Sequence, residues 1–194
     1  VAIVLKKWMR QQKSGSKGRL PDAIVIEHPL YAGGPLGAPN PADLANARFD
    51  FAQVLPDVFK VFDELGIAPG QIPVIVGGGI NSHEKLLAAR LLGAAAVQLG
   101  TPFAVTAEGD AHPNFKRVLL DAKPEDIVTF MSVAGLPARA VRTPWLDTYL
   151  KREARAQSHA CKRSRCVMAF DCLISCGLRD GLAKVGQFCI DNQL

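Results

Sequence analysis

Glycines end two short apolar segments that lie one predicted helix apart. Residues 72–76 are followed by Gly77, Gly78 and Gly79, and residues 95–99 are followed by Gly100 and Thr101. A phosphate can be held with little charge when several backbone N–H groups point at it, and glycine permits that approach because it has no Cβ. The pattern therefore favours a phosphate site, and a plain strand-to-helix turn is the alternative.

Short apolar segments alternate with helical patterns along the chain. Strands are predicted at residues 23–26, 72–76 and 95–99. Helices are predicted at residues 1–12, from Pro56 to Gly66, from a capping box at Asn81 and Glu84 to Gly93, and at residues 113–122. Beyond them the periodicity is lost. The order predicts parallel βαβ units, and such sheets bind ligands at the carboxyl ends of their strands.

The composition restricts the class of protein. The chain has 194 residues, about one domain, and 48% of them are apolar. Because no apolar run approaches the roughly 18 residues of a membrane span and no signal-peptide pattern opens the sequence, we expect a cytoplasmic protein without a membrane partner. Residues 151–165 carry seven basic residues, His159 included, against one acidic residue. No aromatic residues lie between these charges, so a solvated segment is favoured over a nucleic-acid site.

All five cysteines lie near the end of the chain, at Cys161, Cys166, Cys172, Cys176 and Cys189. Their spacing lacks the C-x2-C pairs of recognisable zinc sites, and the odd count argues against a disulfide framework. We expect reduced, partly buried thiols and no metal. A metal or cluster site and a redox pair are the alternatives.

Four motifs carry a resemblance to a known family: "DAIVIEHPLYAGGPLGA", "IPVIVGGGI", "GAAAVQLGTPF" and "GLPARAVRTP". In this order and spacing they resemble the nitronate monooxygenase family, formerly called 2-nitropropane dioxygenases, which are FMN-dependent (β/α)8 barrels related to a flavin-type enoyl reductase. The motifs cover residues 22–144. The ending "CVMAFDCLISCGLRDGLAKVGQFCID" is similar to the Cys-rich tail of one bacterial branch, described as NAD(P)H-dependent flavin oxidoreductases.

The resemblance implies an α/β fold in which residues 1–145 form strands six to eight of an FMN-binding (β/α)8 barrel. Residues 146–194 then form a basic, Cys-rich, helical extension. The resemblance also implies that Gly78 and Gly79 contact the FMN phosphate after strand seven, and that Gly100 and Thr101 do so after strand eight. Ala32 and Gly33, after strand six, are expected near the flavin ring.

The sequence departs from the family at Pro35, where the pattern Gly-Gly-His-x-Gly normally supplies a histidine as catalytic base. Proline cannot accept a proton, so no catalytic residue is assigned. His28 lies on the same loop and is the remaining candidate, with a hydrogen-bonding role as the favoured alternative. An anionic nitronate needs no deprotonation before its oxidation. We therefore expect poor turnover of neutral nitroalkanes.

Other polar residues have two interpretations each. Glu27 ends the strand at residues 23–26, where it is either a catalytic group or a structural hydrogen-bonding residue. His83 follows the glycine cluster and is either a phosphate contact or a solvated side chain. Arg139 and Arg142 bind an anion or form surface ion pairs.

Three functions follow from these observations. The leading hypothesis is FMN-dependent oxidation of a small molecule, an alkyl nitronate, by O2. The runner-up is NAD(P)H-driven reduction of a quinone or an enoyl thioester. Because three strands cannot close an eight-stranded barrel, the third is a truncated, non-catalytic chain. We expect a homodimer, or a complementing N-terminal half, to supply what the barrel lacks, and little FMN affinity without it.

Overall fold

The computed structural model describes residues 1–13, 20–33, 36–38, 40–132 and 136–151. These residues form two compact units. The first comprises Val1–Tyr31 and Ala45–Gly100, and the second comprises Ala32–Leu44 and the chain from Thr101 onward. The basic segment from residue 152 and the five cysteines lie outside the described residues, so the predictions made for them are not tested.

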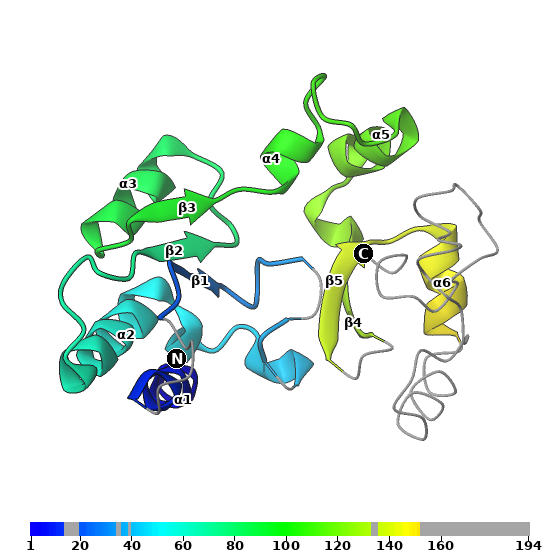
Figure 1. Cartoon of the computed structure of the whole chain (residues 1–194). Coiled ribbons are helices and arrows are strands. Elements are labelled where there is room, and N and C mark those ends of the chain that lie inside the picture. The colour runs from blue at the N-terminus through cyan, green and yellow to red at the C-terminus, as the bar shows by residue number, and fades with distance from the viewer. Residues whose placement is uncertain (14–19, 34–35, 39, 133–135, 152–194) are drawn as a thin grey trace. The chain divides into compact units, whose positions relative to one another are not determined.

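A parallel sheet of three strands forms the centre of the first unit. The strands are β1 (Ile24–Glu27), β2 (Val74–Gly77) and β3 (Ala96–Gln98), in that order across the sheet. Figure 1 shows them side by side. All three agree with the predicted strands to within two residues at each end, and the parallel order confirms the predicted βαβ arrangement.

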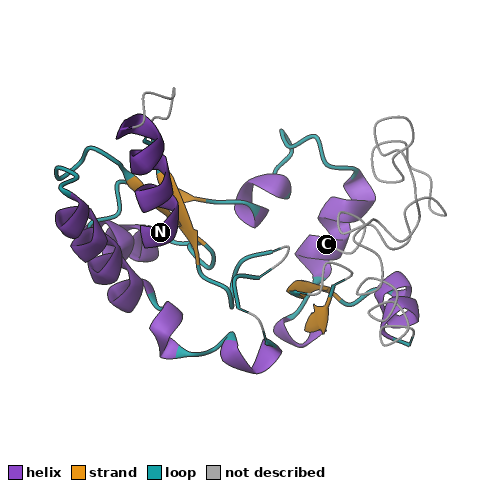
Figure 2. Ribbon diagram, turned by 60° about the horizontal axis from the view of Figure 1, so that its bottom comes forward, coloured by secondary structure: helices purple, strands orange, loops and turns teal. Residues whose placement is uncertain are grey.

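Three helices and a short 3-10 turn accompany this sheet. They are α1 (Ala2–Lys13), η2 (Ala47–Phe49), α2 (Phe51–Leu65) and α3 (His83–Leu91). In Figure 2 the strands of this unit, in orange, lie together beside the purple helices. The core is apolar, as helix-covered parallel strands require. It includes Leu5 of α1, Leu55, Val58 and Phe62 of α2, Val74 and Val76 of β2, and Ala89 of α3.

Only one face of the sheet is covered within this unit. Val74 and Val76 are buried, whereas Val25, on the other face of β1, is 49% exposed. Among the described residues, β1 is therefore covered on one face, although its apolar run supplies side chains to both faces.

Helix α2 starts earlier than predicted. Pro56 was expected to open the helix, but α2 begins at Phe51 and Pro56 lies inside it. A proline inside a helix removes one backbone hydrogen bond. Here that loss is offset by Leu55, which is fully buried in the core. The predicted end at Gly66 is confirmed, because this residue adopts a left-handed φ of 69° and its N–H donates to the carbonyls of Phe62 and Asp63.

The start of α3 also differs from the expected capping box by one residue. Ser82, not Asn81, caps the helix, and its Oγ accepts a hydrogen bond from the N–H of Lys85 at 3.4 Å. Serine is as good a cap as asparagine, so sequence alone could not separate the two neighbours.

The second unit contains an antiparallel hairpin that the sequence pattern did not reveal. Its strands are β4 (Ile127–Met131) and β5 (Pro137–Val141). The unit also includes α4 (Thr101–Ala104), α5 (Pro113–Asp121), α6 (Pro144–Leu150), η1 (Pro41–Asp43) and η3 (Pro124–Asp126). Leu146 and Tyr149 of α6 pack on Phe130 and Ala138 of the hairpin. The Tyr149 hydroxyl donates to the carbonyl of Met131 at 2.6 Å, which fixes this helix on the sheet.

Candidate functional site

The loops that leave the carboxyl ends of β1, β2 and β3 form one edge of the parallel sheet. Register pairs Glu27 with Gly77 and Gly77 with Gln98, so the three strands end together. Parallel sheets bind ligands at this edge. Gly78, Gly79 and Gly100 all follow these strand ends within the first unit.

The loop after β2 can be built only with glycine. Gly78 and Gly79 have φ values of 96° and 73°, a region that side-chain-bearing residues rarely adopt. A Cβ on Gly79 would lie 2.8 Å from Cγ of Tyr31, closer than side-chain atoms pack. Backbone N–H groups in turn conformations form concave anion sites in many proteins.

Lys85 brings a positive charge to this loop. Its Nζ donates to the carbonyl of Gly79 at 3.0 Å and to Oδ1 of Asn81 at 2.8 Å. These contacts tie the first turn of α3 to the loop and orient the Gly79 peptide. An ammonium group has three N–H donors, so one remains for another acceptor.

The N-terminus of α3 already holds a carboxylate of its own chain. The pKa of Glu84 is lowered, first by the hydrogen bond that its carboxylate accepts from its own backbone N–H and then by the Ser82 hydroxyl. His83, beside it, is exposed, which agrees with the solvated alternative. The positive end of the α3 dipole is therefore partly compensated by a carboxylate of the same helix.

Gly100, after β3, lies in open surroundings. A Cβ on this residue would meet no atom within 4 Å. A small side chain would fit there in the free protein, unlike at Gly79. Thr101 begins α4 and belongs to the second unit.

Ala32 and Gly33 also belong to the second unit, where Ala32 is buried and Gly33 is exposed. Pro35 lies outside the described residues. The expected positions of Ala32, Gly33 and Thr101 beside a flavin therefore remain predictions.

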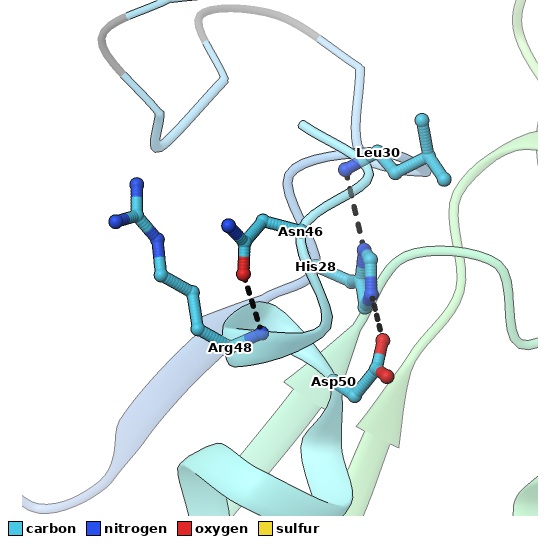
Figure 3. A network of polar contacts seen from close by, with 5 residues as sticks. All are labelled: His28, Leu30, Asn46, Arg48 and Asp50. Atoms are coloured by element: carbon cyan, nitrogen blue, oxygen red, sulfur yellow. Dashed lines mark hydrogen bonds and ion pairs between the residues drawn. The ribbon is translucent and has the colours of Figure 1, made fainter. Parts of the chain in front are cut away.

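Both ring nitrogens of His28 make hydrogen bonds (Figure 3). The N–H of Leu30 donates to Nδ1 at 3.2 Å, so the ring proton of a neutral His28 is on Nε2, which donates to Oδ1 of Asp50 at 3.2 Å. The ring is buried and packs against Tyr31 and Phe51. Because a general base needs an available lone pair, this geometry suits the hydrogen-bonding role.

The contacts of His28 join the loop after β1 to the start of α2. Asp50 is the N-cap residue of α2, and its side chain makes no capping bond to the helix. Just before it, Oδ1 of Asn46 accepts from the N–H of Arg48 at 3.0 Å and shapes the turn shown in Figure 3. His28 thus positions the chain that follows β1.

Arg142 in the second unit forms a surface ion pair, with its Nε 2.7 Å from Oδ1 of Asp147. This favours the structural alternative for that residue. Within the described ranges, no three His, Cys, Asp or Glu side chains come together as metal ligands. No helix among the described residues is long and apolar enough to cross a membrane.

Sequence reasoning missed three residues around the glycine loop: Tyr31, Lys85 and Gln98. For Lys85 there was a signal, since it lies four residues after Asn81 and one helical turn from the loop. Tyr31 and Gln98 contact residues distant in sequence, and no local pattern indicates such contacts.

Parallel strands joined by helices, with glycine loops at their carboxyl ends, are what a segment of a (β/α)8 barrel contains. FabK from Thermotoga maritima has a similar fold, with a TM-score of 0.54 and 27% identity over 81% of this chain and 43% of that chain. The predicted fold class is thereby confirmed.

The chain belongs to the nitronate monooxygenase family, whose model matches residues 3–187. A probable nitronate monooxygenase of Bacillus subtilis is 36% identical over 76 residues, which are 39% of this chain and 22% of that protein. A (3aS,4S,5R,7aS)-5-hydroxy-7a-methyl-1-oxo-octahydro-1H-indene-4-carboxyl-CoA dehydrogenase of Mycobacterium tuberculosis is 35% identical over 94 residues, 48% of this chain and 26% of that protein. These matches confirm the family and its class, the oxidoreductases. The matched segments span about a quarter or less of these relatives' lengths.

Proposed function

We propose that the chain is part of an FMN-dependent oxidoreductase that oxidises alkyl nitronates with O2. The observation that carries this proposal is the loop of Gly78 and Gly79 at the carboxyl end of β2, in a chain whose family model is that of nitronate monooxygenase. Family membership supports the flavin and the oxidation. The loop supports the place of the cofactor phosphate.

The residues present fit a phosphate. The two left-handed glycines leave no Cβ over the loop, Gly100 leaves open space after the neighbouring strand, and Lys85 adds a cation. In this proposal the backbone N–H groups of Gly78, Gly79 and Gly100 hold the phosphate, with Lys85 compensating its charge. Thr101 is the fourth proposed contact.

Bound FMN supplies the transfer of electrons from the substrate to O2. The protein binds and orients the cofactor through its phosphate, and it admits a substrate that is already an anion. Neither of the two candidate positions for a base, His28 and residue 35, is proposed to take a proton, because His28 uses both ring nitrogens and Pro35 stands at the family's histidine position. The proposed substrate is therefore the nitronate and not the neutral nitroalkane.

Oxygen consumption tests this function. The protein in its full encoded length is loaded with FMN and supplied either with ethyl nitronate or with nitroethane at a pH where the latter stays neutral. We expect rapid O2 uptake with the nitronate alone. If the protein holds FMN but consumes O2 with neither compound, nitronate oxidation is overturned, while the proposed flavin site still stands.

One observation favours a second candidate. The Mycobacterium tuberculosis relative named as a CoA-thioester dehydrogenase aligns over 94 residues, against 76 for the Bacillus relative. A quinone or enoyl thioester substrate, with NAD(P)H as reductant, is the corresponding proposal. Stopped-flow mixing with NADH or NADPH distinguishes the two, since rapid bleaching of the flavin absorbance favours the reductase.

The remainder of the barrel is a further part of the proposal. Within the described residues, β1 and β3 each pair with β2 alone, which leaves an unpaired edge on both sides of the sheet. Such edges pair readily with other strands. We propose that additional strands, from the same polypeptide or a complementing one, continue the sheet at both edges. If the protein holds FMN while its β-sheet content stays at three parallel strands, this part is wrong.

A further inference from the structure

Three backbone carbonyls of the loop between α4 and α5 converge on one side chain, that of Lys116 in α5. Its Nζ lies 2.6 Å from the carbonyl oxygen of Thr106, 2.6 Å from that of Gly109 and 3.3 Å from that of Ala107. The three carbonyls match the three N–H donors of an ammonium group in number. Carbonyl oxygens grouped in this way replace the hydration shell of a cation.

The loop reaches this arrangement by folding back on α4. The N–H and Oγ1 of Thr106 both donate to the carbonyl of Phe103, at 3.2 and 2.9 Å. At the other end of the loop, a Cβ on Gly109 would lie 3.1 Å from the carbonyl oxygen of Phe103 and 3.2 Å from that of Ala104. Both ends of the loop are therefore packed against the last residues of α4, and the close approach at the second end favours glycine.

The charge of the loop favours a cation. Residues 105–111 contain two carboxylates, Glu108 and Asp110, and no basic residue. Within the described part of the chain, the half-buried Lys116 nevertheless hydrogen-bonds to carbonyl oxygens and not to either carboxylate. The partial negative charges of converging carbonyls repel one another, and a positive charge at their centre offsets that repulsion. The ammonium thus does more than pair with a surface anion.

A comparison with Lys85 shows what is particular to this arrangement. Lys85 donates to one carbonyl and to one side-chain amide oxygen, which leaves one of its N–H groups for another acceptor. Lys116 has a carbonyl for each of its donors. Hydrogen bonds from a charged donor are stronger than neutral ones, so the loop and α5 are joined chiefly through this one group.

We propose that residues 106–109 form a binding site for a primary ammonium group, which the chain fills with its own Lys116. Lys116 is then a positioning residue that holds the loop after α4 on α5. The site lies away from the ends of the parallel strands, requires no cofactor and goes beyond the proposed function. It follows that a free primary ammonium ion, such as methylammonium, enters the site when the side chain of Lys116 is shortened.

Chemical rescue in the protein of full encoded length tests this site. Lys116→Ala removes the ammonium and leaves space for a small ion, whereas Lys116→Met keeps a long side chain without charge or N–H donors. Lys123→Ala is the control, because Lys123 is an exposed lysine of the same unit. Thermal unfolding of each protein is followed in methylammonium chloride and in tetramethylammonium chloride at equal ionic strength. The two cations have the same charge, but only methylammonium has N–H donors.

We expect Lys116→Ala to lower the midpoint of thermal unfolding by about 4–8 °C, as loss of hydrogen bonds from a charged donor predicts. Methylammonium should raise that midpoint by at least about 2 °C more than tetramethylammonium does. The two salts should act equally on the wild type, Lys116→Met and Lys123→Ala. An unchanged midpoint in Lys116→Ala, or equal effects of both salts on it, overturns the proposal.

A second measurement uses the wild type and so does not depend on the folding of a variant. NMR spectra of the lysine ammonium groups report how fast their protons exchange with water. We expect slower exchange for Lys116 than for Lys123, because carbonyls hold the protons of Lys116. Equal exchange rates overturn the proposal. Neither test involves flavin or O2, so failure here leaves the proposed function standing, and failure of that function leaves this site standing.

Discussion

The ring of Tyr31, four residues after the end of β1, lies directly against Gly79 of the loop after β2, so that a Cβ on Gly79 would come within 2.8 Å of Cγ of the tyrosine. Gly79 also has a left-handed φ of 73°. The two loops are therefore packed together around a residue that has to be glycine.

Comparing substitutions at Gly79 and Gly100 distinguishes an effect on folding stability from an effect on FMN binding. We expect Gly79→Ala to lower the free energy of unfolding by about 1–3 kcal/mol, from backbone strain and overlap with Tyr31. Gly100→Ala, in open surroundings, should change it by less than about 0.5 kcal/mol. Urea unfolding measures both. In FMN titrations both variants should bind more weakly. If Gly100→Ala binds FMN as the wild type does, Gly100 is not a phosphate contact.

The buried imidazole of His28 should contribute to stability. His28→Ala leaves the N–H of Leu30 and the carboxylate of Asp50 without their partner, and we expect a loss of about 1–3 kcal/mol. The matched control is His83→Ala, an exposed histidine in the first turn of α3, for which little change is expected. Chemical denaturation of the two variants gives the comparison. If both variants lose the same small amount of stability, the His28 contacts do not hold the loop.

Glu84 should make stability depend on acid pH. Because its folded-state pKa lies below 4.5, its ordinary value, the ionised carboxylate stabilises the folded state above that pH and the contribution is lost as the pH falls. We expect Glu84→Gln to be less stable than the wild type near neutrality, with the difference shrinking as the pH falls below the ordinary pKa of 4.5. Unfolding curves near neutrality and in acid check this. A difference that persists in acid contradicts it.

A histidine at position 35 should restore the reaction of neutral substrates. In the protein of full encoded length, Pro35→His supplies a base where the family has one, and general bases contribute roughly 10²–10⁴-fold in rate. We expect nitroalkane oxidation to rise by at least about tenfold, while nitronate oxidation changes little. Gly37→His, at an exposed position two residues further along with open space for a side chain, is the control for an added imidazole. A wild type that already oxidises nitroalkanes as fast as Pro35→His refutes the assigned role of Pro35.

The elements that position the site were predictable, because their signals are local. Apolar runs bounded by glycine or proline predicted β1, β2 and β3, and Gly66 marked the end of α2. The hairpin of β4 and β5 was not predictable, because the side chains of β4 do not alternate cleanly between polar and apolar.

The side-chain contacts of the site were harder to predict from the sequence than its backbone conformation. The turn at Gly78 and Gly79 follows from the glycines themselves. The positions of Tyr31 and Gln98 depend on the register of neighbouring strands, which is set by packing over the whole sheet and not by local preference. The partner of His28 lies 22 residues away and was equally hidden.

Amide NMR spectra of the protein in its full encoded length, recorded during titration with FMN and separately with riboflavin, test most directly whether the glycine loops hold a phosphate. We expect FMN to shift the resonances of Gly78, Gly79 and Gly100 strongly, and riboflavin to shift them little, since it lacks the phosphate. Saturable FMN binding that leaves all three amides in place would contradict the account.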